Sequence, residues 1–179
     1  MIRFAKVKPD AVIPSKELEN AGYDLYACFN EDFILIPSLT TKLIPTGIAS
    51  YLGTEYYLQI QERGSTGSKG IKYGAGVIDG TYTGEIFIAI TNCNENPLVI
   101  SKLSSEELFD KYANEIMPWM DCVNIDYFNN NVIVYPYSKA IAQAIIHKVH
   151  NMPVKEISYE ELKSLPSQRG AGKLGSSGK

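Results

Sequence analysis

The sequence contains few residues of the kinds that cross-link a fold or bind a metal. Its 179 residues include three cysteines and two histidines. Cys28, Cys93 and Cys122 are odd in number and form no close pair, which excludes a disulfide framework and indicates free thiols in a reducing compartment. No cysteine or carboxylate cluster accompanies His147 and His150, so the sequence predicts no metal site there.

A basic excess and long apolar runs are also missing. The net charge of −3 argues against a general nucleic-acid binder, which normally carries a positive excess. No apolar run approaches the ~20 residues of a membrane span, and the first residues lack the apolar core of a secretory signal. We therefore expect a cytoplasmic protein, or one acting in the cytoplasm of an infected host cell, without membrane association or direct nucleic-acid binding.

Two common catalytic motifs do not occur. The Gly-x-Ser-x-Gly elbow of serine hydrolases is absent, and neither glycine-rich stretch has the spacing of a P-loop. The first stretch, residues 61–71, follows a predicted strand; it could cradle phosphate through backbone N–H groups and Arg63, or be a solvated loop. The second, residues 169–179, has a composition typical of a disordered terminus.

Short extended segments dominate the chain from the N-terminus to about residue 146. Hydrophobic residues make up 45% of the sequence and charged residues 21%, as in an ordinary globular protein, and the length suits one domain over residues 1–179. The predicted strands are residues 2–7, 33–37, 43–48, 56–61, 85–90, 132–135 and 141–146. Their close spacing predicts an all-β sandwich, jelly roll or barrel. Capping serines and helical spacing predict an amphipathic helix over 104–116 and a weaker helical turn over 158–165.

The stretch from residue 76 to residue 85 carries the clearest functional signal. Asp79-Gly80 is a strong signal for a two-residue hairpin, in which both residues tolerate positive φ. Asp79 could be a turn residue without a chemical role. However, Tyr82 follows three residues later and glycines lie on both sides, so the backbone could bind a planar base while the Asp79 carboxylate positions a water molecule.

These segments together resemble the trimeric dUTP pyrophosphatase (dUTPase) family. Its five short motifs have counterparts in order, at residues 21–25, 63–65, 76–85, 141–143 and 169–178. The resemblance implies a jelly-roll β-barrel that assembles as a homotrimer, with each active site shared between chains and closed by a flexible C-terminal arm at about 167–179.

The resemblance also implies a reaction and its residues. The family hydrolyses dUTP to dUMP and pyrophosphate with Mg²⁺, by attack of water on the α-phosphorus, and so keeps uracil out of DNA. Asp79 would activate the water, and Asp24 would hold Mg²⁺ through a water molecule. The residues implied to bind substrate are Arg63, Gly64, Ser65, Gly76, Val77, Ile78, Tyr82, Gln143, Arg169, Leu174, Gly175, Ser176 and Ser177.

Three positions depart from the family pattern. Gly64 stands where a serine is usual, Ala140 where an arginine is common, and Leu174 where an aromatic residue usually stacks on the uracil. The related dCTP deaminases are the nearest enzymatic alternative, and the Asp79/Tyr82 stretch and the C-terminal arm disfavour it.

The distance between the third and fourth motifs is about twice the family's usual length. The excess, an insertion at about 92–137, contains the predicted helix and the only tryptophan, Trp119. It could be a surface elaboration or a protein-binding module, since Trp and Tyr are favoured interface anchors. Some phage dUTPases carry an insertion here, so a phage-type member is plausible. The alternative function is therefore a dUTP-binding regulator that acts on a protein partner through this insertion.

Overall fold

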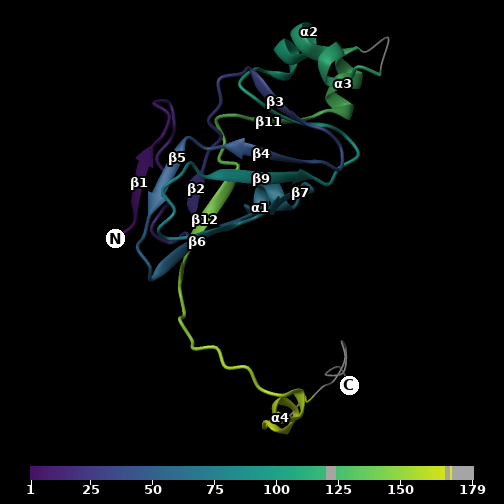
Figure 1. Ribbon diagram of the computed structural model, residues 1–179. Helices are drawn as coiled ribbons and strands as arrows, with labels where there is room; N and C mark the ends of the chain where they lie inside the picture. Colours follow the sequence, from purple (N-terminus) through teal and green to yellow (C-terminus); the bar gives the residue numbers. More distant parts are fainter. Residues whose placement is uncertain (120–123, 168–169, 171–179) are drawn as a thin grey trace. The chain divides into compact units, whose positions relative to one another are not determined.

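The computed structural model describes residues 1–119, 124–167 and 170 (Figure 1). The chain divides into two compact units, Met1–Val149 and His150–Lys179. The strands all lie in the first unit: β1 (Arg3–Lys6), β2 (Tyr23–Leu25), β3 (Phe33–Ile36), β4 (Thr41–Pro45), β5 (Ile48–Tyr51), β6 (Tyr56–Gln61), β7 (Ile71–Gly74), β8 (Val77–Ile78), β9 (Phe87–Asn92), β10 (Leu98–Ser101), β11 (Ile133–Pro136) and β12 (Ala142–Lys148). Its helices are α1 (Gly64–Gly67), α2 (Ser105–Ile116) and α3 (Ile125–Asn131).

Within the described residues, the strands form four small sheets around a main apolar core, and two smaller apolar clusters are also present. The strand orders are β1-β5, β11-β10-β3, β2-β12-β6-β8 and β4-β9-β7. Pairing is antiparallel except between β10 and β11. The all-β prediction is confirmed. The short strands produce this architecture because apolar residues alternate along them and pack inward from every sheet.

The sheet β11-β10-β3 is apolar on both faces. Leu98 and Ile100 of β10 face the main core, whereas Val99 between them belongs to a second core with residues of α2 and α3. The neighbouring strands alternate in the same way, since Phe33, Leu35 and Val134 pack against the second core. The helices therefore cover a sheet face that would otherwise be exposed to water.

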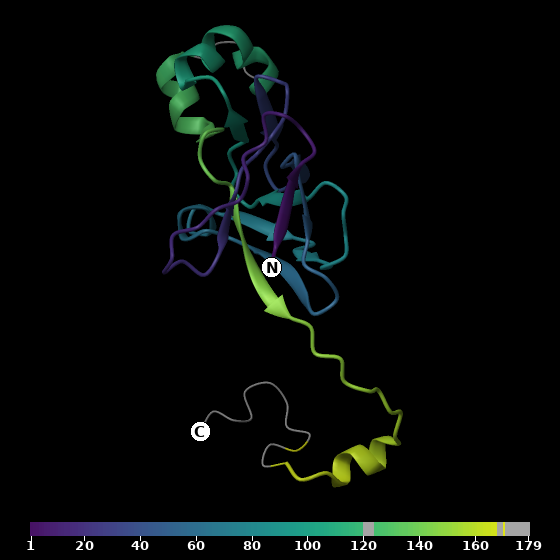
Figure 2. The same ribbon diagram turned by 90° about the vertical axis from the view of Figure 1, so that its left-hand side faces the viewer.

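Helices α2 and α3 lie together beside β3 and β11 (Figures 1 and 2). The predicted helix over 104–116 is confirmed as α2, whose Ser104 side chain accepts a hydrogen bond from the Glu107 amide in a capping box. Helix α3 was not expected from the sequence. It begins after Asn124, whose side chain accepts from the Tyr127 amide, and it buries Phe128 completely.

The predicted hairpin at Asp79-Gly80 is wrong in its strand pairing. β8 pairs with β6, while β9 pairs with β4 and β7. A turn is present, with the Tyr82 amide donating to the Asp79 carbonyl at 3.0 Å, but Gly80 does not have positive φ. Gly80 is required for a different reason: a Cβ there would collide with the carbonyls of Gly53 and Tyr56. The loop is thus fixed against the β5–β6 turn and not by a partner strand.

The second unit contains α4 (Tyr159–Ser164), which confirms the weaker helical turn predicted over 158–165. The Ser158 side chain caps it by accepting from the Glu161 amide at 3.1 Å. Across the described parts of both units, we find no helix with the length and apolar character needed to cross a membrane.

Candidate functional site

Arg63 and Gln143, predicted to bind phosphate, and Asp24, predicted to hold Mg²⁺, lie at one end of the sheet β2-β12-β6-β8. Gln143 of β12 is paired with Asp24 of β2 on one side and with Gln61 of β6 on the other. Arg63 lies two residues after the end of β6 and is the N-cap of the single turn of α1. Residues from three distant sequence segments therefore meet because three strands are in register.

The Arg63 guanidinium is held from two sides. Its Nε lies 3.1 Å from Asp24 Oδ1 and its Nη2 lies 3.4 Å from Asp24 Oδ2, while Nη1 donates to the Ala140 carbonyl at 3.1 Å. Both charged side chains are 32% exposed. The paired fork geometry fixes the plane of the guanidinium and leaves it accessible to an anionic ligand.

Gln143 is fixed by a close approach to backbone. Its Nε2 donates to the Glu62 carbonyl at 2.7 Å. A Cβ on Gly22 would lie 2.8 Å from the Gln143 Cβ and 2.5 Å from its Oε1, so only glycine leaves room for this side chain. The glycine of the first motif therefore leaves the space that the glutamine of the fourth motif occupies.

Gly64 and Ser65 form the first positions of α1 and are exposed. A Cβ on Gly64 would meet no atom within 4 Å. The glycine at this position is not required by packing, which leaves open space beside Arg63 for a ligand.

The loop after β8 presents the predicted catalytic carboxylate to solvent. Asp79 is exposed, as is Val77 at 61%, while Ile78 is partly buried against the main core. The Gly76 carbonyl accepts from the Ile60 amide at 2.7 Å, and a Cβ on Gly76 would approach the Ile60 carbonyl to 2.8 Å. The loop thus lies directly against β6.

Tyr82 is 47% exposed, and its hydroxyl donates to the Glu85 carbonyl at 3.2 Å. The Glu85 carboxylate accepts from the Gly47 amide at 2.8 Å and lies 3.7 Å from the Lys8 ammonium. Glu85 is therefore occupied in holding this loop against the β4–β5 turn.

We call Asp24, Arg63 and Gln143 together the Arg63 group. Within one chain, the structure does not bring Asp79 close to this group. β8 pairs Ile78 with Leu58, so Asp79 lies level with Tyr57, four positions before Gln61 on β6. Four positions correspond to about 13 Å along a strand. Among the described residues, no hydrogen bond or ion pair joins Asp79 to Asp24, Arg63 or Gln143. One chain therefore presents two separate half-sites.

The sequence prediction missed two tyrosines behind the Arg63 group. The Tyr135 hydroxyl donates to the Ala140 carbonyl at 2.7 Å, and the Tyr73 hydroxyl donates to the Ile141 carbonyl. Burial raises the pKa of Tyr73 to about 12 and also raises the pKa of Tyr135. No sequence motif marks these two tyrosines, because their place behind Arg63 depends on strand register, which is known only from the fold.

The side chains beside Arg63 offer few oxygen ligands for a metal. Across residues 1–119, 124–167 and 170, no cluster of three or more His, Cys, Asp or Glu side chains could hold an ion. Asp24 is the one acidic side chain in the Arg63 group. A single carboxylate fits Mg²⁺ of the kind that keeps several waters and is otherwise bound by substrate phosphates. Arg169, Leu174, Gly175, Ser176 and Ser177, the predicted arm residues, lie outside the described residues.

A family model described as dUTPase matches residues 9–104. The deoxyuridine 5'-triphosphate nucleotidohydrolase of Candida albicans is 28% identical over 173 residues, which cover 96% of this chain and 84% of that protein.

Two solved structures share the fold. A mutant of the Staphylococcus bacteriophage 80alpha dUTPase with dUpNHpp has a TM-score of 0.70 and 20% identity, covering 100% of this chain and 99% of that one. That phage dUTPase is described as controlling transfer of virulence genes by a G protein-like mechanism. A mutant dUTPase from phage phi11 of S. aureus, which coordinates a structural Mg(II) ion, has a TM-score of 0.61 and 18% identity. The match covers 89% of this chain and 99% of that one.

Proposed function

The chain belongs to the dUTPase family, and from this premise we propose that it hydrolyses dUTP to dUMP and pyrophosphate at sites assembled from more than one chain. The observation that carries the proposal is the register of Asp24, Gln143 and Gln61, which places Arg63 and Asp24 together at one end of the sheet. A guanidinium, an amide and a carboxylate at one sheet end can bind a triphosphate with its cation.

Arg63, Ser65 and Gln143 bind the phosphates in this proposal. The Arg63 guanidinium is held by Asp24 and the Ala140 carbonyl, and its remaining N–H groups can donate to phosphate oxygens. Exposed Gly64 leaves space for these oxygens. Asp24 would hold Mg²⁺ through a water molecule, beside the phosphate-binding side chains, and the ion would supply charge neutralisation for the triphosphate.

Asp79 acts as the general base. Its exposed carboxylate takes a proton from a water molecule, whose oxygen bonds to the α-phosphorus while the bond from that phosphorus to the bridging oxygen breaks. The leaving pyrophosphate is bound by Arg63. The backbone of Gly76, Val77 and Ile78 binds the uracil, and the Tyr82 ring lies under the deoxyribose, where it leaves no room for a 2′-hydroxyl.

The separation of the two half-sites supports a site shared between chains, and membership of the dUTPase family favours a homotrimer as that assembly. Because Asp79 and Arg63 lie at different positions in one chain, a base and its triphosphate would be contacted by different chains. The arm residues Arg169, Leu174, Gly175, Ser176 and Ser177 would close over such a site, with Arg169 on the terminal phosphate.

The test of this function is pyrophosphate release from dUTP, dCTP, dTTP and UTP with Mg²⁺. We expect turnover of dUTP alone, because a site that hydrogen-bonds one base edge rejects others strongly. Asp79→Asn keeps the size of the side chain and should lower kcat by about 10²–10⁴-fold, the usual contribution of a general base. Wild-type protein that binds dUTP without turnover would refute the hydrolase proposal, and equal rates for the variant would refute the role of Asp79.

A second function, that of a dUTP-binding regulator that acts on a protein partner, is favoured by the surface of the helical layer. The helical layer is defined as α2, α3 and the described residues between them. Trp119 is 65% exposed and Tyr127 is 41% exposed there. Exposed aromatic side chains on a helical layer suit a protein partner. The partner-binding proposal predicts that Trp119→Ala with Tyr127→Ala abolishes partner capture and leaves dUTP turnover unchanged.

A deletion that tests the predicted insertion at 92–137 must keep the core strands at its two ends. Leu98, Ile100 and Tyr135 lie in the main core, so removing 96–135 would damage the fold together with the helices. A deletion confined to residues 103–132, bridged by a Gly/Ser linker, keeps β10 and β11. It needs polar replacements at the sheet positions that the helices otherwise cover, which are Phe33, Leu35, Val99 and Val134. Loss of turnover and of partner binding in both this deletion and Asp79→Asn would contradict separate functions.

A further inference from the structure

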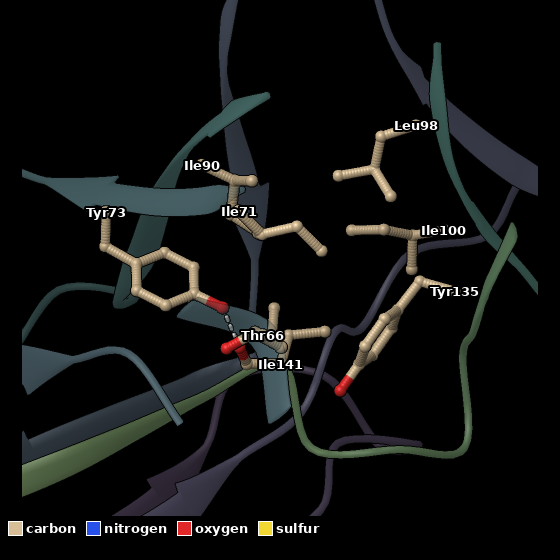
Figure 3. Close-up of a pocket in the computed structure, with 8 residues that line it drawn as sticks. All are labelled: Thr66, Ile71, Tyr73, Ile90, Leu98, Ile100, Tyr135 and Ile141. Carbon is tan, nitrogen blue, oxygen red and sulfur yellow. Dashed lines mark hydrogen bonds between the residues drawn. The ribbon is translucent and has the colours of Figure 1, made fainter. Parts of the chain in front are cut away.

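Two tyrosines, Tyr135 buried and Tyr73 partly buried, lie behind the phosphate-binding side chains, and their hydroxyls point to neighbouring carbonyls. Tyr73 of β7 and Tyr135 of β11 line one small cavity with Ile141, and Figure 3 shows the Tyr73 hydroxyl directed at the Ile141 carbonyl. The Tyr135 hydroxyl donates to the Ala140 carbonyl at 2.7 Å. The two phenols therefore hold two consecutive carbonyls at the entry to β12.

The Ala140 carbonyl is shared between the core and the site. It accepts from Tyr135 on the inner side and from Arg63 Nη1, at 3.1 Å, on the outer side. A carbonyl oxygen has two lone pairs, so these two donors saturate it. The Ile141 amide, in turn, donates to the Leu25 carbonyl at 2.8 Å, which fixes the same peptide group from β2.

Arg63 depends on this carbonyl for its orientation. Among the described residues, the other hydrogen bonds of its guanidinium are both with Asp24, a side chain that is 32% exposed. Tyr135 itself is 7% exposed and cannot move without disturbing the core. The rigid reference for the guanidinium plane is thus the Ala140 carbonyl, and the buried phenol holds that carbonyl in place.

We propose that Tyr135 is a positioning residue for Arg63, acting through the Ala140 carbonyl that both side chains share. The functional consequence rests on the proposed function, because it requires Arg63 to bind the triphosphate. Tyr135 belongs to β11, the strand that leads out of the helical layer, so the proposal links that part of the chain to phosphate binding.

Tyr135→Phe and Tyr73→Phe form a matched pair. Each removes one hydroxyl from the same cavity, but only the Tyr135 hydroxyl contacts the carbonyl that Arg63 uses. We expect Tyr135→Phe to raise the KM for dUTP by about three- to tenfold, the worth of one hydrogen bond, with little change in kcat. Tyr73→Phe should leave KM within about twofold of the wild type.

A double-mutant cycle tests whether the effect passes through Arg63. In an Arg63→Lys background, which lacks the fork, Tyr135→Phe should change KM by less than about twofold. Additive effects of the two substitutions on KM would overturn the proposal, as would equal KM increases in the two phenylalanine variants.

A measurement without substrate separates this proposal from the enzymatic one. Hydrogen exchange of the Arg63 Nε–H, followed by NMR, should be faster in Tyr135→Phe than in Tyr73→Phe or the wild type, because the Ala140 carbonyl that orients the guanidinium is no longer held by the phenol. Equal exchange in all three proteins would overturn the positioning role. Failure of the wild type to hydrolyse dUTP would refute the proposed function alone, since the exchange measurement does not depend on turnover.

Discussion

Tyr73 should make the stability of this protein sensitive to alkaline pH. The pKa of Tyr73 is raised from 10.0 to about 12, chiefly by burial. Above pH 10 the unfolded chain releases this proton, whereas the folded protein keeps it until about pH 12. The neutral phenol therefore contributes stability that is fully present below pH 10 and is lost as the pH rises from 10 to about 12.

The size of the loss follows from the pKa shift. Two pKa units correspond to about 2.7 kcal/mol of unfolding free energy. A domain of this kind has roughly 5–15 kcal/mol in total, so the loss is measurable. At neutral pH, Tyr73→Phe should cost about 1–3 kcal/mol, because the buried Ile141 carbonyl loses its donor.

Urea unfolding at several pH values between 8 and 11.5 measures both quantities. Far-UV circular dichroism is the suitable signal, because Trp119 is 65% exposed and would report poorly on unfolding. The wild type should lose its advantage over Tyr73→Phe as the pH rises above 10. Tyr82→Phe is the control, since that side chain is 47% exposed. A stability difference between wild type and Tyr73→Phe that stays constant over this pH range would refute the reasoning.

Three further predictions concern the site, the helical layer and the arm. Gly22→Ala should displace Gln143 and raise the KM for dUTP by about tenfold or more with normal circular dichroism; an unchanged KM would contradict the close approach. Phe128→Ala, at a fully buried position stacked edge-on with Phe109, should cost about 3–5 kcal/mol in urea unfolding; a cost below about 1 kcal/mol would exclude tight packing there. Leu174→Phe should lower KM, because an aromatic ring on uracil adds about 0.5–1.5 kcal/mol, and identical kinetics would contradict this.

Local patterns in the sequence were sufficient to predict most strands and α2. Alternation identified β6 and β12, and the Ser104 capping box identified α2, because both signals depend on neighbouring residues alone. The strand pairing around Asp79 could not be predicted this way. Asp-Gly favours a hairpin locally, but contacts of Gly80 with the distant Gly53 and Tyr56 carbonyls override that preference.

The candidate site shows the same division. The motif resemblance named Asp24, Arg63 and Gln143 without showing that they are adjacent, since adjacency depends on the register of three strands. Tyr135 carries no motif and was missed, because its role arises from one carbonyl it shares with Arg63. The separation of Asp79 from Arg63 likewise follows from the pairing of β8 with β6.

The double-sided sheet β11-β10-β3 also constrains how the helical layer could have been gained or lost in evolution. Its outward side chains Phe33, Leu35, Val99 and Val134 are apolar because helices cover them. In a relative without the helices these four positions would face water, where apolar side chains favour aggregation. Gain of the layer therefore requires replacements on three strands that are distant in sequence. An alignment of relatives with and without the layer should show these four positions changing between apolar and polar together.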